Sequence, residues 1–207
     1  VALVGESGSG KSTLARVITG LLPATKGSIS FLGQNLPLEL KNRDKNSLRR
    51  LQMIYQSPDT ALNPKQTVRT VIGRPLAFYF GITGQKAEDR IRDLLTRIEL
   101  DPDNYLYRLT TELSGGEKQR ICIARALAAK PDLIICDEVT SALDQIVAEG
   151  ILTLLQDLQN EMNLSYLFIT HDLATVKAIS DKIVIMLEGR IIEQGEKEEI
   201  LTPPHHE

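Results

Sequence analysis

The sequence predicts an α/β fold with a mainly parallel sheet, into which a helical lobe is inserted. Near both ends of the chain, short apolar runs alternate with stretches of helical spacing, a pattern typical of parallel strands joined by helices. Between residues 57 and 113 the strand-like runs disappear and only helical spacing remains. A chain of 207 residues, 42% of them hydrophobic, is long enough to bury a core without disulfides.

Composition excludes several classes of protein. The longest apolar runs, such as 133–136 and 77–80, are far shorter than the ~18 residues of a membrane span. A net charge of -3 gives no support to nucleic-acid binding, so we expect no nucleic-acid partner. Cys122 and Cys136 lack the spacing of a metal site and are expected to be buried and reduced. The chain begins at Val1 inside a strand-like run and ends on a loop-like tail, so we expect a fragment cut at both ends.

The elements before the helical lobe follow from composition and from helix-stop signals. They are a strand at 1–4, a loop rich in Gly and Ser at 5–10, a helix at 12–22 that stops at Pro23, and strands at 28–32 and 51–55.

Two helices are expected within the lobe. Ile91, Leu94, Leu95 and Ile98 recur at the spacing of one helical face. Residues 67–80 are also helical in pattern, with an interruption near Pro75. The apolar and aromatic stretch 76–80 is expected to lie in the core of the lobe rather than in a groove for a partner.

After the lobe, strands and helices alternate again. The expected elements are a helix at 117–129, a strand at 132–136, a helix whose apolar face runs from 147 to 158, a strand at 165–169, a helix at 173–179 and a strand at 182–187.

A phosphate-binding loop is predicted between the first strand and the first helix. Gly5-Glu6-Ser7-Gly8-Ser9-Gly10-Lys11-Ser12 matches G-x-x-x-x-G-K-[ST] in full. Glycines allow successive N–H groups to point at phosphate oxygens, and the helix start favours an anion. We therefore expect residues 5–13, Thr13 included, to bind a nucleotide, with Lys11 on its β- and γ-phosphates and Ser12 on Mg²⁺. The alternative is a Gly-Ser turn that happens to contain Lys.

Two acids, Asp137 and Glu138, end the apolar strand at 132–136. The carboxyl end of a parallel strand faces the ligand crevice of such a sheet. Asp137 is expected to hold Mg²⁺, and Glu138 to accept a proton from an attacking water or to orient that water. The spacing does not tell which acid binds Mg²⁺ and which acts on the water. The alternative is that both are solvated acids at the end of a strand, without a role in catalysis.

Four further stretches complete an ordered set of motifs. Leu113-Ser114-Gly115-Gly116-Glu117-Lys118-Gln119-Arg120 resembles the signature motif of ATP-binding-cassette (ABC) ATPases. Ser141-Ala142-Leu143-Asp144 resembles the D-loop of that family, Gln56 its Q-loop glutamine and His171 its switch histidine. With the phosphate loop and the two acids, the six motifs occur in the order of the family and extend from Gly5 to His171.

The resemblance implies a fold and a division of the chain. The fold would be a P-loop NTPase (RecA-like) core formed by residues 1–56 and 114–207, with the ABC helical subdomain at 57–113. It also implies that ATP and Mg²⁺ are bound between two chains arranged head to tail, the phosphate loop of one facing the signature motif of the other. Ser114, Gly115 and Gly116 begin a helix and so offer a second anion site.

The resemblance assigns roles to the remaining motif residues. Gln56 would sense Mg²⁺ and the attacking water, His171 would contact the γ-phosphate, and Asp144 would couple the two sites across the interface. Glu117 stands where the family most often has Gln. The aromatic residue that stacks on adenine in the family would lie before Val1.

One branch of the family is indicated by the segment 56–64, which includes Leu62-Asn63-Pro64. It resembles the segment after the Q-loop in dipeptide and oligopeptide (peptide/nickel) importers, and the tail Pro203-Pro204-His205-His206 resembles the start of their C-terminal extension. The implied protein is a peripheral ATPase at the cytoplasmic face of the cell membrane. Its partners would be a second ABC subunit or cassette, in a homo- or heterodimer, and integral membrane permease subunits that contact the helical subdomain.

Three alternatives remain within the family. The stretch Leu-Ser-Gly-Gly-Glu is also compatible with a soluble tandem-cassette ATPase that acts on the ribosome. The Asn-Pro segment and the helical lobe argue against that class. A DNA-repair cassette would carry a zinc module or a long coiled coil before the signature, and no cysteine pair lies there. A regulatory cassette that binds ATP without hydrolysing it would lack the carboxylate of Glu138.

Overall fold

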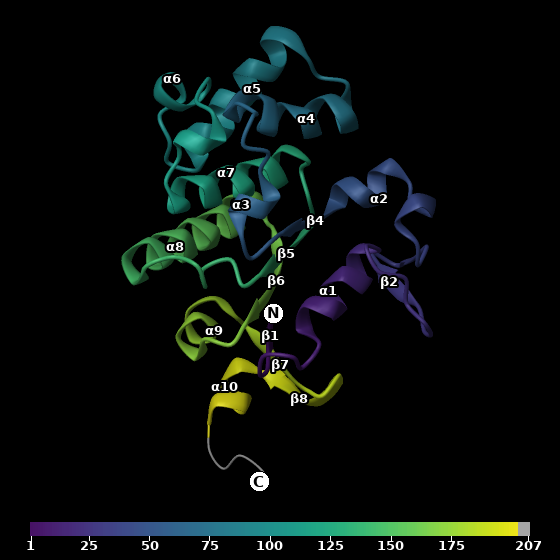
Figure 1. Ribbon diagram of the computed structural model, residues 1–207. Coiled ribbons are helices and arrows are strands. Elements are labelled where there is room, and N and C mark those ends of the chain that lie inside the picture. The colour runs from purple at the N-terminus through teal and green to yellow at the C-terminus, as the bar shows by residue number, and fades with distance from the viewer. Residues whose placement is uncertain (203–207) are drawn as a thin grey trace.

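The computed structural model describes residues 1–202 as a six-stranded sheet with helices on both faces, joined to a helical region (Figure 1). The expected tail extension at 203–206 lies outside the described residues. The strand order is β4-β5-β6-β1-β7-β8. These strands are β1 Ala2–Val4, β4 Leu51–Ile54, β5 Leu133–Asp137, β6 Ser165–Thr170, β7 Lys182–Leu187 and β8 Arg190–Glu196.

The sheet is parallel from β4 to β7, and only the edge strand β8 runs antiparallel. The register pairs Val4 with Thr170 and Asp137 with Ile169. The carboxyl ends of β1, β5 and β6 therefore meet at one edge of the sheet, where parallel sheets of this kind bind ligands. The mainly parallel α/β fold predicted from the sequence is confirmed.

Helices cover the sheet and also form the region between β4 and β5. The first group is α1 Lys11–Thr19, η1 Leu40–Asn42, α2 Lys45–Arg50, α8 Gln145–Met162, α9 Leu173–Ile179 and α10 Lys197–Leu201. The second group is α3 Pro58–Ala61, α4 Val68–Phe80, α5 Gly84–Arg97, α6 Pro102–Tyr105, η2 Thr110–Glu112 and α7 Gly115–Ala128. The division of the chain at residues 57 and 113 stays a prediction.

The central strand β5 explains why its sequence is apolar without alternation. Ile134 and Cys136 are fully buried in a cluster with α7 and α8, whereas Ile135 is buried on the opposite face with Leu3 and Ala15. Both faces of the strand are thus covered, as in other parallel sheets. Cys122 is also buried, which raises the pKa of its thiol to about 11, and both cysteines are free.

Two helices differ from the sequence expectation. α1 ends at Thr19 rather than at 22, because Gly20 takes a left-handed conformation and its N–H bonds to the carbonyl of Val17. α4 continues through Pro75 without the expected interruption. Proline removes one helical hydrogen bond, and the burial of the neighbouring Ile72 and Leu76 holds the helix together across it.

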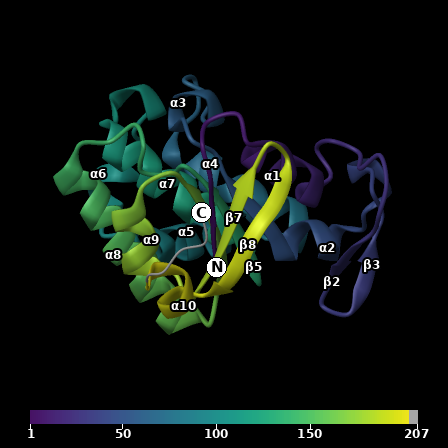
Figure 2. The same cartoon turned by 90° about the horizontal axis from the view of Figure 1, so that it is seen from below.

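The strand expected at 28–32 lies outside the main sheet. Residues Ile29–Phe31 form β2, which pairs with β3 (Gln34–Leu36) as a separate antiparallel hairpin. Figure 2 shows this hairpin on the far side of α1 and α2 from the yellow β7–β8 pair. The sequence predicts neither β3 nor β8. β3 has only three residues, β8 is exposed along most of its length, and neither contains a long apolar run.

The stretch 76–80 is mostly not core, so that expectation was wrong. Leu76 is buried at 3% exposure, but Phe78 is 54% exposed and Phe80 36% exposed. The helical period places Leu76 with Ile72 on the inner face and turns Phe78 outward, where the ammonium of Lys45 lies 4.8 Å from the centre of its ring. No helix within residues 1–202 is both long and apolar enough to cross a membrane.

Candidate functional site

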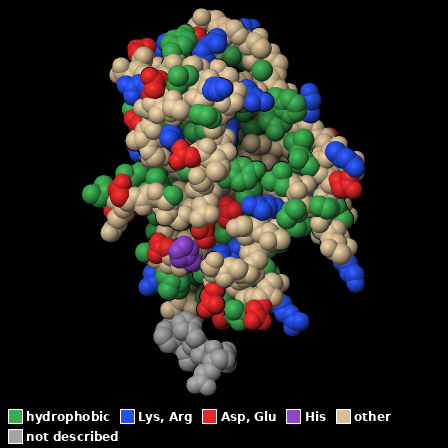
Figure 3. Space-filling model, in the orientation of Figure 1, with side chains coloured by type: hydrophobic (Ala, Val, Ile, Leu, Met, Phe, Trp, Pro, Cys, Tyr) green, Lys and Arg blue, Asp and Glu red, His purple; other side chains and the backbone are tan. Residues whose placement is uncertain are grey.

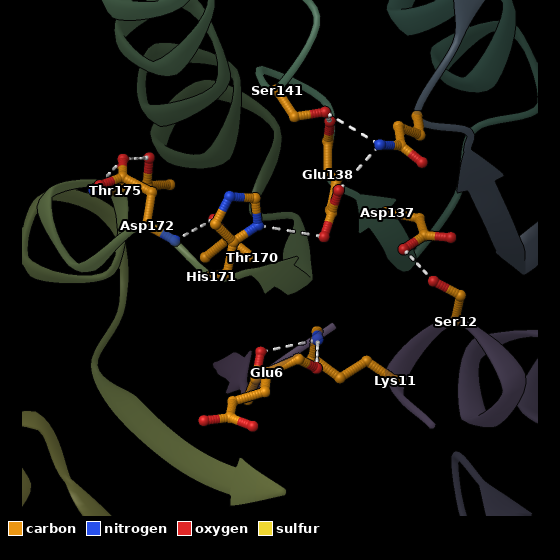
Figure 4. A network of polar contacts seen from close by, with 12 residues as sticks. Glu6, Lys11, Ser12, Asp137, Glu138, Ser141, Thr170, His171, Asp172 and Thr175 are labelled. Atoms are coloured by element: carbon orange, nitrogen blue, oxygen red, sulfur yellow. Dashed lines mark hydrogen bonds and ion pairs between the residues drawn. The ribbon is translucent and has the colours of Figure 1, made fainter. Parts of the chain in front are cut away.

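The loop between β1 and α1 wraps around the side chain of Lys11. Its Nζ donates to the carbonyl oxygens of Gly5 and Glu6, 2.8 Å away in each case, and lies 3.5 Å from the Oγ of Ser9. Lys11 is only 5% exposed, so its charge is held at a fixed place beneath the loop. Figure 4 shows this folded-back side chain.

Two glycines give the loop its curvature. Gly8 and Gly10 have φ of 85° and 101°, a left-handed region that other residues rarely adopt. Gly10 is the N-cap of α1, so the exposed Ser7, Gly8 and Thr13 surround the start of a nine-residue helix. Backbone N–H groups at such a helix start favour an anion, which fits the predicted phosphate site.

Ser12 and Asp137 are far apart in sequence and adjacent in space. The hydroxyl of Ser12 donates to Oδ1 of Asp137 at 2.9 Å. Burial raises the pKa of the Asp137 carboxyl, and the charge of Glu138 adds to that rise, while the Ser12 hydrogen bond, Arg16 and Lys11 oppose it. A buried carboxylate beside a hydroxyl is an oxygen donor set of the kind that Mg²⁺ prefers.

Glu138 stands at the centre of a second group of side chains. Its Oε2 accepts a hydrogen bond from Nε2 of Gln56 at 2.8 Å, and its Oε1 lies 3.2 Å from Nδ1 of His171. The three residues follow β4, β5 and β6, and Figure 4 shows the Glu138–His171 contact beside the Ser12–Asp137 pair. The structure thus brings the predicted residues of four motifs to one edge of the sheet.

The backbone of Glu138 is itself unusual. Its φ is 49°, in the left-handed region, directly after the last strand residue Asp137. Its N–H still bonds to the carbonyl of Ile169 at 2.9 Å, so the turn remains fixed to β6. Backbone strain at a non-glycine residue is often found at functional positions, and here it directs two adjacent acids to different partners.

The loop that carries His171 is fixed by its neighbours. The carboxylate of Asp172 caps α9 by accepting from the N–H groups of Ala174 and Thr175, both at 3.0 Å, and from the hydroxyl of Thr175 at 2.6 Å. These hydrogen bonds hold the pKa of Asp172 below its usual value, and the bond from the Thr175 hydroxyl has the largest effect. The His171 side chain remains 63% exposed, so it can be reached from outside the chain.

Ser141 is a member of the site that the sequence did not single out. Its Oγ lies 3.3 Å from Nε2 of Gln56 and donates to the carbonyl oxygen of Glu138 at 3.0 Å. It therefore joins the D-loop to the Gln56–Glu138 pair. Its only sequence signal was its place at the start of the D-loop stretch, where Asp144 alone was selected.

The signature residues lie elsewhere in the chain. Ser114 caps α7, and Asp144 caps α8 by accepting from the N–H of Val147 at 3.0 Å. A Cβ added to Gly116 would lie 2.6 Å from Cγ1 of Val147, so the starts of α7 and α8 pack closely. Within residues 1–202, Ser114, Gly115 and Gly116 share no hydrogen bond with the phosphate loop.

A groove of about 1140 Å³ separates the sheet from the helical region. Its walls include Met53 of β4, Tyr55 beside the predicted Gln56, Arg74 and Phe78 of α4, and Arg125 of α7. Figure 3 shows the molecule hollowed where these elements meet, with hydrophobic side chains around the hollow. The groove therefore adjoins the polar site through the segment that follows β4.

Comparison with curated proteins gives clear relatives. The chain is 45% identical over 208 residues to the oligopeptide transport ATP-binding protein OppF of Salmonella typhimurium, covering 100% of this chain and 62% of OppF. It is 43% identical over 206 residues to the glutathione import ATP-binding protein GsiA of the same organism, covering 100% of this chain and 33% of GsiA. The chain thus spans less than two thirds of these relatives.

Solved structures agree with these relatives. CbiO1 from Clostridium perfringens, part of the ABC transporter complex CbiONQ, superposes with a TM-score of 0.84 at 29% identity, over 96% of this chain and 77% of that one. The ATP-binding cassette MJ0796, a dimer bound to ADP and phosphate, gives 0.80 at 28% identity, over 94% and 84%. The family model described as ABC transporter matches residues 1–141. The chain therefore belongs to the ABC transporter family, as its own sequence motifs, its sheet and these matches together show.

Proposed function

We propose that this chain binds and hydrolyses ATP to power an ABC transporter that imports peptides. The observation that carries the proposal is the position of Glu138 between Gln56 and His171, next to the Ser12–Asp137 pair and the Lys11 loop. The likeness to OppF, an oligopeptide transport ATP-binding protein, supports the class of transport, and the likeness to GsiA, a glutathione import ATP-binding protein, supports its direction.

In this proposal the phosphate loop binds the triphosphate. The N–H groups of residues 5–13 and the ammonium of Lys11 bind its oxygens, and Lys11 exchanges loop carbonyls for phosphate. Mg²⁺, held by Ser12 and Asp137 with Gln56 nearby, would neutralise phosphate charge during the reaction. The fit rests on the donor set, a hydroxyl and a carboxylate 2.9 Å apart.

The remaining residues act on the water and on the phosphate. Glu138 accepts the proton of the attacking water or orients it, and the Gln56 amide holds one of its oxygens in place. His171, exposed and in contact with Glu138, reaches the γ-phosphate. Asp172 and Thr175 keep the His171 loop rigid during this step.

We further propose that two copies of the cassette, or this one and a different cassette, pair head to tail around ATP. The exposed start of α7 at Ser114 and Gly115 can bind an anion. Within the described residues 1–202, it shares no hydrogen bond with the phosphate loop of the same chain. A second chain can bring that helix start to the nucleotide, with Asp144 beside it. The related cassette MJ0796 is a dimer when bound to ADP and phosphate, which supports pairing of cassettes.

The variant Glu138→Gln tests the proposal. Glutamine keeps the size of the side chain but cannot accept the proton, so ATP stays bound and the paired state accumulates. We expect light scattering to report a monomer without ATP and a doubled mass with ATP. The control Lys11→Ala/Glu138→Gln, which loses the phosphate contact, should remain monomeric. A Glu138→Gln chain that binds ATP and never doubles in mass contradicts pairing of identical copies.

We propose that the groove receives a short helix of a membrane permease subunit, which places the chain at the cytoplasmic face of the membrane. The groove has apolar walls and two arginines, Arg74 and Arg125, and it reaches Tyr55, the residue before Gln56. A helix bound there would therefore contact the segment that leads to the polar site. Phe78→Asp adds a charge at the exposed wall, and we expect co-purification with the permease to fall about tenfold, which corresponds to about 1.4 kcal/mol.

A matched control separates this effect from a general loss of solubility or folding. Ile192 on β8 is 59% exposed and lies outside the groove lining, so Ile192→Asp should leave co-purification unchanged. ATP-dependent pairing should survive in both variants. Equal losses in Phe78→Asp and Ile192→Asp, or none in either, count against the groove as the docking place.

A further inference from the structure

The start of α7, the helix that carries the signature motif, is fixed by a side chain from outside that motif. Tyr105, the last residue of α6, donates its hydroxyl to Oε1 of Glu117. The other carboxylate oxygen, Oε2, accepts from the N–H of Ser114 at 2.7 Å. The N–H of Glu117 in turn lies 3.4 Å from the Oγ of Ser114. Both oxygens of Glu117 are therefore engaged, one by α6 and one by the signature loop.

A cation completes the arrangement on the α6 side. The guanidinium of Arg108 lies 4.6 Å from the centre of the Tyr105 ring, a cation–π distance. The hydroxyl of Tyr105 holds the pKa of Glu117 below its usual value, and Arg108 acts in the same direction. The carboxylate is thus stabilised in its charged form, between Tyr105 of α6 and the N–H of Ser114.

A charged residue at this place has two opposite effects. A carboxylate in the first turn stabilises a helix through the partial positive charge of the helix start. The same charge repels an anionic ligand that approaches that helix start. Within the described part of the chain, the N–H groups of Gly115 and Gly116 have no acceptor, so they are free to meet such a ligand. A neutral glutamine would cause no such conflict.

We propose that Tyr105 is a positioning residue for the signature motif, binding Oε1 of the Glu117 carboxylate so that the carboxylate stays on the Ser114 N–H and does not compete with a ligand for the free N–H groups of Gly115 and Gly116. This inference rests on the proposed function, in which those groups meet the phosphate of ATP held by the opposite chain. The Ser114 hydroxyl, which serves as an acceptor for the Glu117 N–H, keeps its proton for the same phosphate.

The test is a double-mutant cycle in the Glu138→Gln protein, read as the ATP concentration at half-maximal pairing. Tyr105→Phe removes one hydroxyl without changing the ring, and we expect the midpoint to rise about fivefold. Glu117→Gln removes the charge, so Tyr105→Phe in that background should shift the midpoint less than about twofold. A midpoint in the Tyr105→Phe/Glu117→Gln variant that returns to that of the Glu138→Gln parent is the result that a merely structural contact does not give.

Two controls identify what has changed. The affinity of the monomer for a fluorescent ATP analogue reports its own phosphate loop and should stay constant in Tyr105→Phe. The midpoint of thermal unfolding reports folding and should fall by no more than about 2–4 °C, since one hydrogen bond is lost. An equal shift with Glu117 intact and in the Glu117→Gln background, or no shift in either, overturns the inference. If Glu138→Gln itself never pairs with ATP, the proposed head-to-tail dimer fails as well, which is a different outcome from pairing that ignores Tyr105.

Discussion

Replacing Lys11 with alanine is expected to lower kcat/KM for ATP hydrolysis by about 10²–10³-fold. The ammonium is buried and bound to the carbonyl oxygens of Gly5 and Glu6, which in the proposed function it exchanges for phosphate oxygens when ATP binds. A charge fixed before the reaction needs no reorganisation during it. Alanine also removes the group that fills the loop, so the loss combines weaker binding with a slower reaction.

The measurement is steady-state phosphate release over a range of ATP concentrations. Lys26→Ala, which removes the same charge from an exposed position, is the matched control and should behave as the unaltered protein. A Lys11→Ala protein with turnover within about twofold of the unaltered one would show that the loop is not a phosphate site.

Replacing Gly5 with alanine is expected to abolish nucleotide binding and to destabilise the fold. A Cβ at this position would lie 2.1 Å from the backbone oxygen of Met186 and 2.7 Å from the Oγ of Ser9. The Met186 oxygen belongs to β7 and has no room to yield, so the loop must move instead. Overpacking of this kind costs about 1–3 kcal/mol, and the displaced loop no longer aligns its N–H groups.

Gly8→Ala serves as the comparison. Gly8 has φ of 85° and nothing within 4 Å of an added Cβ, so alanine there meets backbone strain but no clash. Its cost should be about 1–2 kcal/mol. Urea unfolding and binding of a fluorescent ATP analogue report the two effects separately. Retention of nucleotide binding in Gly5→Ala would mean that the loop adjusts at this position after all.

Local chemistry explains what the sequence could predict of the site. The phosphate loop is a run of eight residues whose geometry depends on its own glycines, and Asp137 and Glu138 directly follow the apolar run 133–136. Gln56 and His171 were found only through their order in the family's set of motifs. Their contacts with Glu138 depend on β4, β5 and β6 lying side by side, which spacing alone does not specify.

The missed features depend on partners distant in sequence. Ser141 and Tyr105 are ordinary residues until the fold sets Gln56 beside one and Glu117 beside the other. The exposure of Phe78 could not be read from an apolar run, since hydrophobicity does not tell which face of a helix is covered. α1 ends before the predicted residue 22 because Gly20, ahead of Pro23, adopts the left-handed conformation that ends a helix.

The buried cluster that surrounds β5 has a mechanical consequence. Cys136 and Val139, on either side of the two acids, belong to the same cluster as Val71 and Ile72 of α4, which borders the groove. Close-packed interiors are nearly incompressible and transmit strain. A displacement of α4 is therefore expected to shift the strand end that carries Asp137 and Glu138 through an unbroken series of packed side chains.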